Sequence, residues 1–174
     1  NTPSGNCYRM RRRTVPASSL RGEPFFHDLD EETLARIESY VYDRNYEPRQ
    51  VIFFPDDPCD YAYWVRKGRV RIARQAGTGR EVTFRHLYPG DFFGEECLLD
   101  LPTRGVCAEA MEDTTLCLLR ADDFRRICRD VEQVSWKVSL YLCERVRRIE
   151  GAMAELVFNP VRSRIASCLL YLVS

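Results

Sequence analysis

The sequence predicts a mainly β fold with helices, in which an antiparallel sandwich or jelly roll is followed by a long α-helix. Two observations carry this prediction. Between residues 49 and 120, short β-rich runs alternate with turn residues, and this close spacing favours antiparallel strands over a parallel sheet with crossover helices. After residue 121 the pattern becomes helical and includes a heptad repeat. A closed barrel of this kind has an interior that can hold one small ligand.

Composition bounds the class of protein. The chain of 174 residues is 45% hydrophobic, enough for one domain with a real core, or for one domain and a fragment of another. Lys and Arg total 26, as do Asp and Glu, so no net positive charge points to nucleic acid. The apolar runs are too short for a membrane span or a signal peptide, and we therefore expect a cytoplasmic protein with no membrane partner.

The cysteines and histidines argue against a metal site. Eight cysteines are dispersed without a Cys-x-x-Cys pair, and the only histidines are His27 and His86. We expect neither a disulfide framework nor a bound metal, but thiols that pack as small apolar side chains. We also do not expect an enzyme, because no nucleophile triad and no pair of carboxylates repeats a known spacing.

The N-terminal part of the chain divides in two. Residues 1–22 contain Pro, Ser, Gly and four arginines between positions 9 and 13, which predicts a flexible basic arm that buries little surface. Between residues 25 and 42, Asp30 and the two acids after it open an amphipathic pattern with Leu34, Ile37 and Val41 at helical spacing. This pattern predicts a helix that packs on the core.

The β-rich segment contains six expected strands, at residues 51–54, 61–65, 69–73, 81–87, 106–110 and 114–119. The turn residues at 55–58, 67–68 and 77–79 separate several of them.

A long helical region follows. An acidic start at residues 121–123 leads into helix through Cys128 and then from Val131 to Phe158. Apolar residues recur there at alternating spacings of four and three, the seam of a coiled coil, and they are Leu142, Val146, Ile149, Met153 and Leu156. We predict a parallel homodimer through this seam, although the same residues could instead pack on the barrel of one monomer. Asn159 and Pro160 then end the helix and cap a new one, which carries Ile165, Leu169 and Leu172.

The loop from Pro89 to Val106 carries the parts of a small anion site. Gly94 permits close approach of a ligand to the backbone, and residues 95–99 suggest a helical turn whose first N–H groups point outward. Glu95 is an acceptor suited to a sugar hydroxyl, and Arg104 offers a planar, always charged fork for a phosphate oxygen. Phosphate and sugar are therefore expected at the same place.

Three motifs within this loop, Phe93-Gly94-Glu95, Leu98-Leu99 and Pro102-Thr103-Arg104, resemble the phosphate-binding cassette of cyclic-nucleotide-binding domains. From about Phe25 to Ser174 the chain resembles the CRP/FNR transcription regulators. Two positions depart from the family: Glu96 stands where an apolar residue is usual, and Gly105 where Ala or Ser is usual. A second carboxylate in the turn repels a bound phosphate.

The resemblance implies a division into four parts: the arm at 1–22, a cyclic-nucleotide-binding jelly roll at 23–121, a dimerisation helix at 122–158, and the start of a truncated helix-turn-helix domain at 159–174. DNA would bind through a domain absent from this chain. The resemblance implies that the effector is a cyclic nucleotide, with cAMP as the first candidate. Its expected contacts are Phe93, Gly94, Glu95, Glu96, Cys97, Arg104, Gly105, Val106, Ile149 and Glu150. The last two stand where cAMP-responsive relatives carry a Thr-Ser pair that caps the adenine.

Other effectors stay open. Cys117 stands where FNR-type sensors carry an iron–sulfur ligand, but Cys7 alone cannot replace their N-terminal cluster. Haem could use His86 or His27 with Cys7. The cassette could also be purely structural, with Arg104 paired to Glu95 or Glu96, or belong to the regulatory half of a kinase or channel. The run from 159 to 170, which resembles the first helix of the family's DNA-binding domain, favours the regulator.

Overall fold

The computed structural model describes residues 15–16, 20–75, 80–99 and 101–158. The chain divides into two compact units, one ending at Asp130 and the other beginning at Val131. Each unit is described by itself below.

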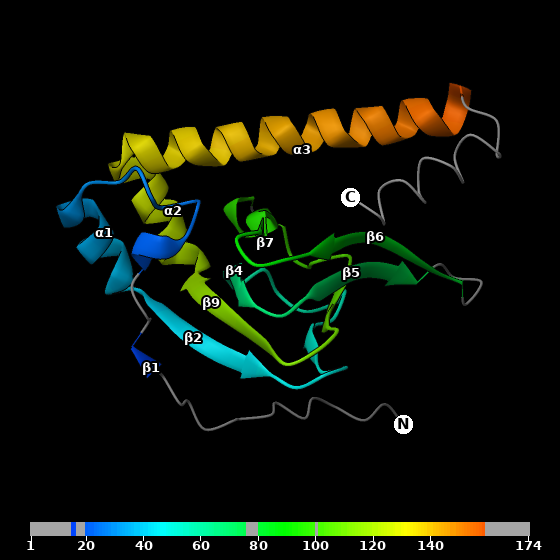
Figure 1. The fold of residues 1–174 in the computed structure, drawn as a ribbon, viewed down its shortest axis with the longest axis horizontal. Helices are drawn as coiled ribbons and strands as arrows, with labels where there is room; N and C mark the ends of the chain where they lie inside the picture. The colour runs from blue at the N-terminus through cyan, green and yellow to red at the C-terminus, as the bar shows by residue number, and fades with distance from the viewer. Residues whose placement is uncertain (1–14, 17–19, 76–79, 100, 159–174) are drawn as a thin grey trace. The chain divides into compact units, whose positions relative to one another are not determined.

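The first unit is a barrel of two antiparallel sheets (Figure 1). The five-stranded sheet has the order β1-β2-β9-β4-β7, and the four-stranded sheet has the order β3-β8-β5-β6. This arrangement confirms the predicted antiparallel jelly roll. The strands are β1 (Val15–Pro16), β2 (Val41–Tyr46), β3 (Val51–Phe53), β4 (Tyr61–Lys67), β5 (Val70–Gln75), β6 (Glu81–Leu87), β7 (Phe92–Phe93), β8 (Cys107–Ala110) and β9 (Thr114–Arg120).

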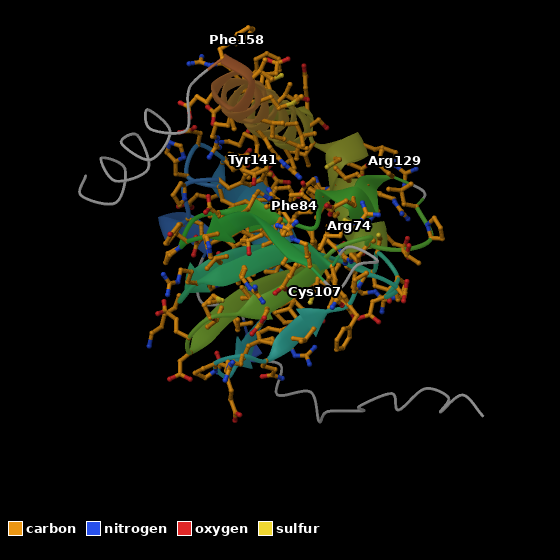
Figure 2. The ribbon with its side chains drawn as sticks, turned by 90° about the vertical axis from the view of Figure 1, so that its right-hand side faces the viewer. Arg74, Phe84, Cys107, Arg129, Tyr141 and Phe158 are labelled. Atoms are coloured by element: carbon orange, nitrogen blue, oxygen red, sulfur yellow. The ribbon has the colours of Figure 1, made fainter. Side chains whose placement is uncertain are left out.

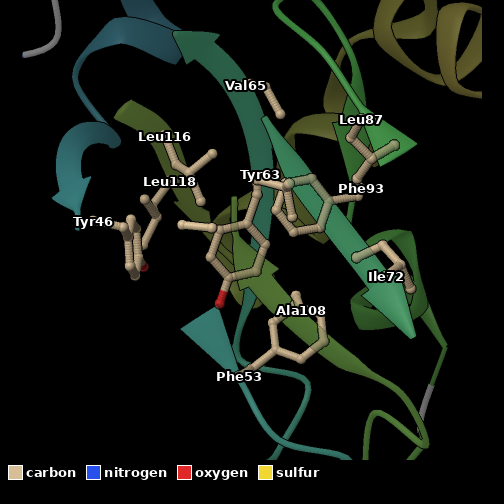
Figure 3. Close-up of a cluster of buried hydrophobic side chains, with 12 residues drawn as sticks. Tyr46, Phe53, Tyr63, Val65, Ile72, Leu87, Phe93, Ala108, Leu116 and Leu118 are labelled. Atoms are coloured by element: carbon tan, nitrogen blue, oxygen red, sulfur yellow. The ribbon is translucent and has the colours of Figure 1, made fainter. Parts of the chain in front are cut away.

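The barrel core lies between the two sheets and combines aromatic and aliphatic side chains (Figure 3). The rings of Tyr63 and Phe93 stack with their centroids 4.8 Å apart, and the Phe53 ring lies 5.7 Å from that of Tyr63. Burial of each such side chain stabilises the fold by about 1.5 to 3 kcal/mol. This cluster holds in place the strands that are joined to the cassette.

The outer face of β4, which lies between β9 and β7 in the five-stranded sheet, is also covered. Trp64 is fully buried, and its ring lies 5.1 Å from Phe26, 4.8 Å from Phe92 and 5.8 Å from Phe124. Phe124 belongs to α2 (Ala121–Asp130), while Phe26 follows the short 3-10 turn η1 (Leu20–Gly22). Because both faces of β4 are buried, its sequence is almost continuously apolar instead of alternating.

The N-terminal helix is shorter than the sequence predicted. Helix α1 spans Glu31–Glu38, and the Oδ1 atom of Asp30 accepts a hydrogen bond of 2.9 Å from the Thr33 N–H at its start. The expectation that Val41 lies on this helix is wrong, since Val41 begins β2 and pairs with Leu119 of β9. Pairing with β9 along all six residues outweighs the low β propensity of the polar centre of β2.

The predicted helical region contains two helices, α2 and α3 (Glu132–Phe158). Residue 131 separates them, and the Val131 carbonyl accepts the first hydrogen bonds of α3, from Val134 at 3.1 Å and Ser135 at 3.3 Å. The helix predicted through Cys128 and the helix predicted from Val131 to Phe158 are thus both present, and residue 131 lies between them. No helix in the described part of the chain is long and apolar enough to cross a membrane.

Candidate anion-binding site

The cassette begins where β7 ends. Gly94 has a φ of 83°, in the left-handed region, and leads into the 3-10 turn η2 (Glu95–Leu98). A Cβ atom at Gly94 would lie 2.8 Å from the Tyr61 carbonyl oxygen and 3.0 Å from Nη1 of Arg104. Only glycine combines this conformation with so close an approach of backbone and guanidinium. The turn predicted at 95–99 is thus present, one residue shorter.

Arg104 lies near the C-terminal end of the cassette, after the turn η2. Its own N–H donates to the Asp57 carbonyl at 3.1 Å, and the next N–H, of Gly105, donates to the Pro55 carbonyl at 2.8 Å. The side chain is only 1% exposed, and Nη2 donates to the Tyr61 carbonyl at 2.7 Å. The guanidinium also lies 4.5 Å above the Phe53 ring, a cation–π contact.

Part of this buried guanidinium has no acceptor. Within the described part of the chain, Nε and Nη1 of Arg104 make no hydrogen bond. The carboxylate of Glu96 approaches Nη1 to 4.0 Å, which is an ion pair but too long for a hydrogen bond. Buried donors of a charged group cost free energy unless they are bonded. Arg104 therefore presents donors to which an anion can bind.

Glu95 is buried beside a second arginine. Its side chain is 7% exposed, and Oε1 lies 3.7 Å from Nη2 of Arg85 on β6. Arg85 was not among the residues expected at the site. The signal that could have found it is the alternation along the strand at 81–87, which places Arg85 on the same face as Leu87.

Cys97 contributes less than the sequence suggested. Its N–H donates to the Gly94 carbonyl at 3.1 Å within the turn. The N–H groups of Glu95 and Glu96 precede this first bond of the turn and are the better candidates to bind an anion. Burial raises the pKa of the Cys97 thiol to about 12, although Arg104 opposes the shift. The thiol is therefore protonated and inert at neutral pH.

The remaining expected ligand contacts fall in both units. Gly105 has a φ of 68°, and a Cβ there would meet nothing within 4 Å, so the space for a larger residue exists but the backbone conformation disfavours one. Phe93 and Val106 pack in and against the barrel core. Ile149 and Glu150 lie on α3, both exposed. Their participation in the site stays a prediction.

The expected dimer seam also lies on α3. Val146, Ile149 and Met153 are exposed in the single chain, and Leu142 is half-buried. Leu156 belongs to the same helix, but its side chain is outside the described set. The residues 159–174 assigned to a DNA-binding domain also lie outside the described residues, as do most of the arm at 1–22.

The alternative sensor residues are placed as follows. Cys117 is buried in β9 opposite Asp43, and burial raises the pKa of its thiol to about 12. His27 is exposed and bonds locally, to the Pro24 carbonyl at 2.7 Å and to Asp28 at 2.8 Å. Cys7 lies outside the described residues. Among the residues that are described, no three His, Cys, Asp or Glu side chains gather as a metal site would require.

A hollow elsewhere in the barrel unit is a weaker candidate. It has a volume of about 590 Å³, and none of its lining residues belongs to the cassette. Polar groups along it already bond to one another, as Thr115 does to Asn45 at 2.8 Å and the Glu47 N–H to Gln50 at 2.9 Å. We therefore place the site at the cassette, where charged groups converge.

Comparison with known proteins agrees with this geometry. Residues 43–131 match the family model of the cyclic nucleotide-binding domain. The chain is 34% identical over 154 residues to the cyclic AMP receptor protein of Thermus thermophilus. The matched residues cover 88% of this chain and 71% of the relative. It is 26% identical over 147 residues to a CRP-like cAMP-activated global transcriptional regulator of Mycobacterium tuberculosis, covering 84% and 66% respectively. The crystal structure of the Thermus thermophilus catabolite activator protein matches with a TM-score of 0.68 at 34% identity, covering 87% of this chain and 71% of that one.

The fold and the cassette thus define a cyclic nucleotide-binding domain. Within that class, the chain belongs to the CRP/FNR family of transcription regulators. The resemblance predicted from the residues of the cassette is confirmed.

Proposed function

We propose that this chain is the sensory and dimerising part of a transcription regulator, that it binds a cyclic nucleotide, with cAMP as the first candidate, and that it is not an enzyme. The observation that carries the proposal is the buried guanidinium of Arg104 beside Gly94, whose Nε and Nη1 donors make no hydrogen bond to any residue that the structure describes. An anionic group of the size of a phosphate would satisfy these donors. The cAMP-related names of the Thermus and Mycobacterium relatives support the choice of nucleotide.

In the proposed complex, the phosphate binds Arg104 and the N–H groups of Glu95 and Glu96. The buried carboxylate of Glu95 accepts a hydrogen bond from the ribose hydroxyl. Phosphate and sugar recognition then come from one turn and one loop, both anchored to the aromatic core. Ile149 and Glu150 are proposed to face the base, without the hydroxyl pair found in cAMP-responsive relatives.

The proposed assembly is a parallel homodimer through the apolar residues of α3. Large apolar side chains that are exposed on one stripe of a long helix are typical of a helix–helix interface. Effector binding would act on a DNA-binding domain that begins at about residue 159, by shifting an equilibrium between two conformations. Such coupling is typically worth about 1 to 3 kcal/mol, the difference between effector affinities for the two states.

Isothermal titration with cAMP and cGMP tests the proposal, using wild-type protein, Arg104→Ala and Arg104→Lys. Loss of charge-assisted hydrogen bonds worth about 1.5 to 3 kcal/mol should weaken binding in Arg104→Ala by roughly 10- to 150-fold. Arg74→Ala, which removes an exposed guanidinium from β5, serves as the matched control (Figure 2). Absence of binding at millimolar nucleotide in folded wild-type protein would overturn the proposal.

A further inference from the structure

Arg85 is directed toward the barrel interior by an irregularity in β6. In the pairing with β5, Ala73 lies opposite Thr83 and Ile72 lies opposite Arg85, so Phe84 is an extra residue on β6. Residues opposite each other in an antiparallel pair project to the same face, and Ile72 is part of the buried core. Bulges of this kind re-aim side chains. Phe84, which is labelled in Figure 2, is exposed, whereas Arg85 is half-buried.

The inward side chain ends at the cassette. Nη2 of Arg85 lies 3.7 Å from Oε1 of Glu95, with 21% of the arginine side chain and 7% of the glutamate side chain exposed. An ion pair so little exposed is screened less than a surface pair. A carboxylate has about four lone-pair sites, so an ion pair with Arg85 does not by itself prevent Glu95 from accepting a hydrogen bond from a hydroxyl group.

Arg85 also balances the charge of the site. The cassette holds two carboxylates, Glu95 and Glu96, and the guanidinium of Arg104. Without Arg85 this set would carry an excess negative charge before any phosphate arrived. With Arg85 the two carboxylates face two guanidiniums.

We propose that Arg85 is a positioning residue for ribose recognition, which acts by holding the carboxylate of Glu95 oriented toward the 2′-hydroxyl of the nucleotide. This proposal rests on the proposed function, because it takes a cyclic nucleotide as the ligand. It assigns to Arg85 a role in discriminating ribose from deoxyribose, separate from the phosphate contact of Arg104.

The test compares cAMP with 2′-deoxy-cAMP by isothermal titration of wild-type protein, Arg85→Ala and Arg85→Lys. Wild-type protein should prefer cAMP by about 10-fold or more, as expected for a hydrogen bond to a charged group. Arg85→Ala should reduce this preference by about 5-fold, because a Glu95 carboxylate that is no longer held in place forms a weaker hydrogen bond with the ribose hydroxyl. Arg85→Lys keeps the charge and should retain most of the preference. Arg74→Ala, the exposed arginine of the same sheet, should change nothing.

The outcomes separate the two proposals. If Arg85→Ala weakens both nucleotides by the same factor, or leaves the preference unchanged, the positioning role is overturned while cyclic-nucleotide binding stands. If wild-type protein binds neither nucleotide, the proposed function fails, and the role of Arg85 fails with it. Thermal melting of each variant checks that the barrel is intact, so that loss of fold is not counted as loss of recognition.

Discussion

Replacement of Glu96 should tighten nucleotide binding. Its carboxylate lies 4.0 Å from Nη1 of Arg104, and 24% of its side chain is exposed. It therefore competes with a bound phosphate for the positive charge of Arg104. A phosphate bound to Arg104 would lie at about 6 Å from this carboxylate, where repulsion amounts to about 0.7 kcal/mol in water and about 2.8 kcal/mol at an effective dielectric constant of 20. Glu96→Leu should therefore tighten cAMP binding by roughly 3- to 100-fold.

Isothermal titration of Glu96→Leu, Glu96→Gln and Glu112→Gln measures this effect. Glu96→Gln keeps the size of the side chain and removes its charge, so it should give most of the gain if the repulsion is electrostatic. Glu112→Gln removes an exposed carboxylate in the turn between β8 and β9 and should leave the affinity unchanged. The gain should also shrink as salt is added, because the carboxylate is partly exposed.

Two results would refute the reasoning. Equal affinities of wild-type protein and both Glu96 variants would mean that this carboxylate does not act on the ligand. Absence of binding in all of them, Glu96→Leu included, would mean that the cassette is structural and that Arg104 serves to connect it to Tyr61 and Phe53.

Two further predictions concern assembly and pH. The double variant Val146→Glu and Met153→Glu buries charge in the proposed seam and should yield monomers in sedimentation, whereas an unchanged dimer would contradict the seam. Burial raises the pKa of Glu23 above 4.5, against the attraction of Arg66 and with a contribution from Asp43. The contribution of Glu23 to the free energy of unfolding is therefore fully present below its pKa in the unfolded chain. It is lost as the pH rises through its pKa in the folded protein. In urea unfolding, Glu23→Gln should therefore gain stability relative to wild type as the pH rises above about 4.5, and a difference that does not change with pH would count against this prediction.

The barrel could be predicted because its signals are local. Turn residues at 55–58 and 67–68 end strands by their own backbone preferences, and β-branched and aromatic runs fill the space between them. The end of α1 could not be placed in this way. Val41 fits the helical period, yet it belongs to β2, because pairing with β9 provides a ladder that no local pattern records. A tertiary contact decided between two acceptable local structures.

For the candidate site, too, the sequence predicts the local motif but not the tertiary contacts. Gly94, Glu95 and Arg104 form a motif, and from this motif we predict which groups face the ligand. Burial of the Arg104 guanidinium against Phe53, and its bond to the Tyr61 carbonyl, depend on how β3 and β4 meet. These contacts fix which of its donors are used and which are open, and the spacing of residues along the chain carries no record of them.

Glu96 and Arg85 illustrate why a motif can mislead when it is taken one position at a time. From the sequence, Glu96 only adds a repulsive charge to the cassette. In the folded barrel, the bulge in β6 brings Arg85 to 3.7 Å from Glu95, so a second guanidinium accompanies the second carboxylate. The two residues should therefore act on different parts of the ligand. Removal of Glu96 should tighten binding of cAMP and of 2′-deoxy-cAMP alike, because its charge acts on the phosphate, whereas removal of Arg85 should weaken cAMP more than 2′-deoxy-cAMP, because it acts through Glu95 on the ribose. The departure at Glu96 would then tune the cassette without abolishing it.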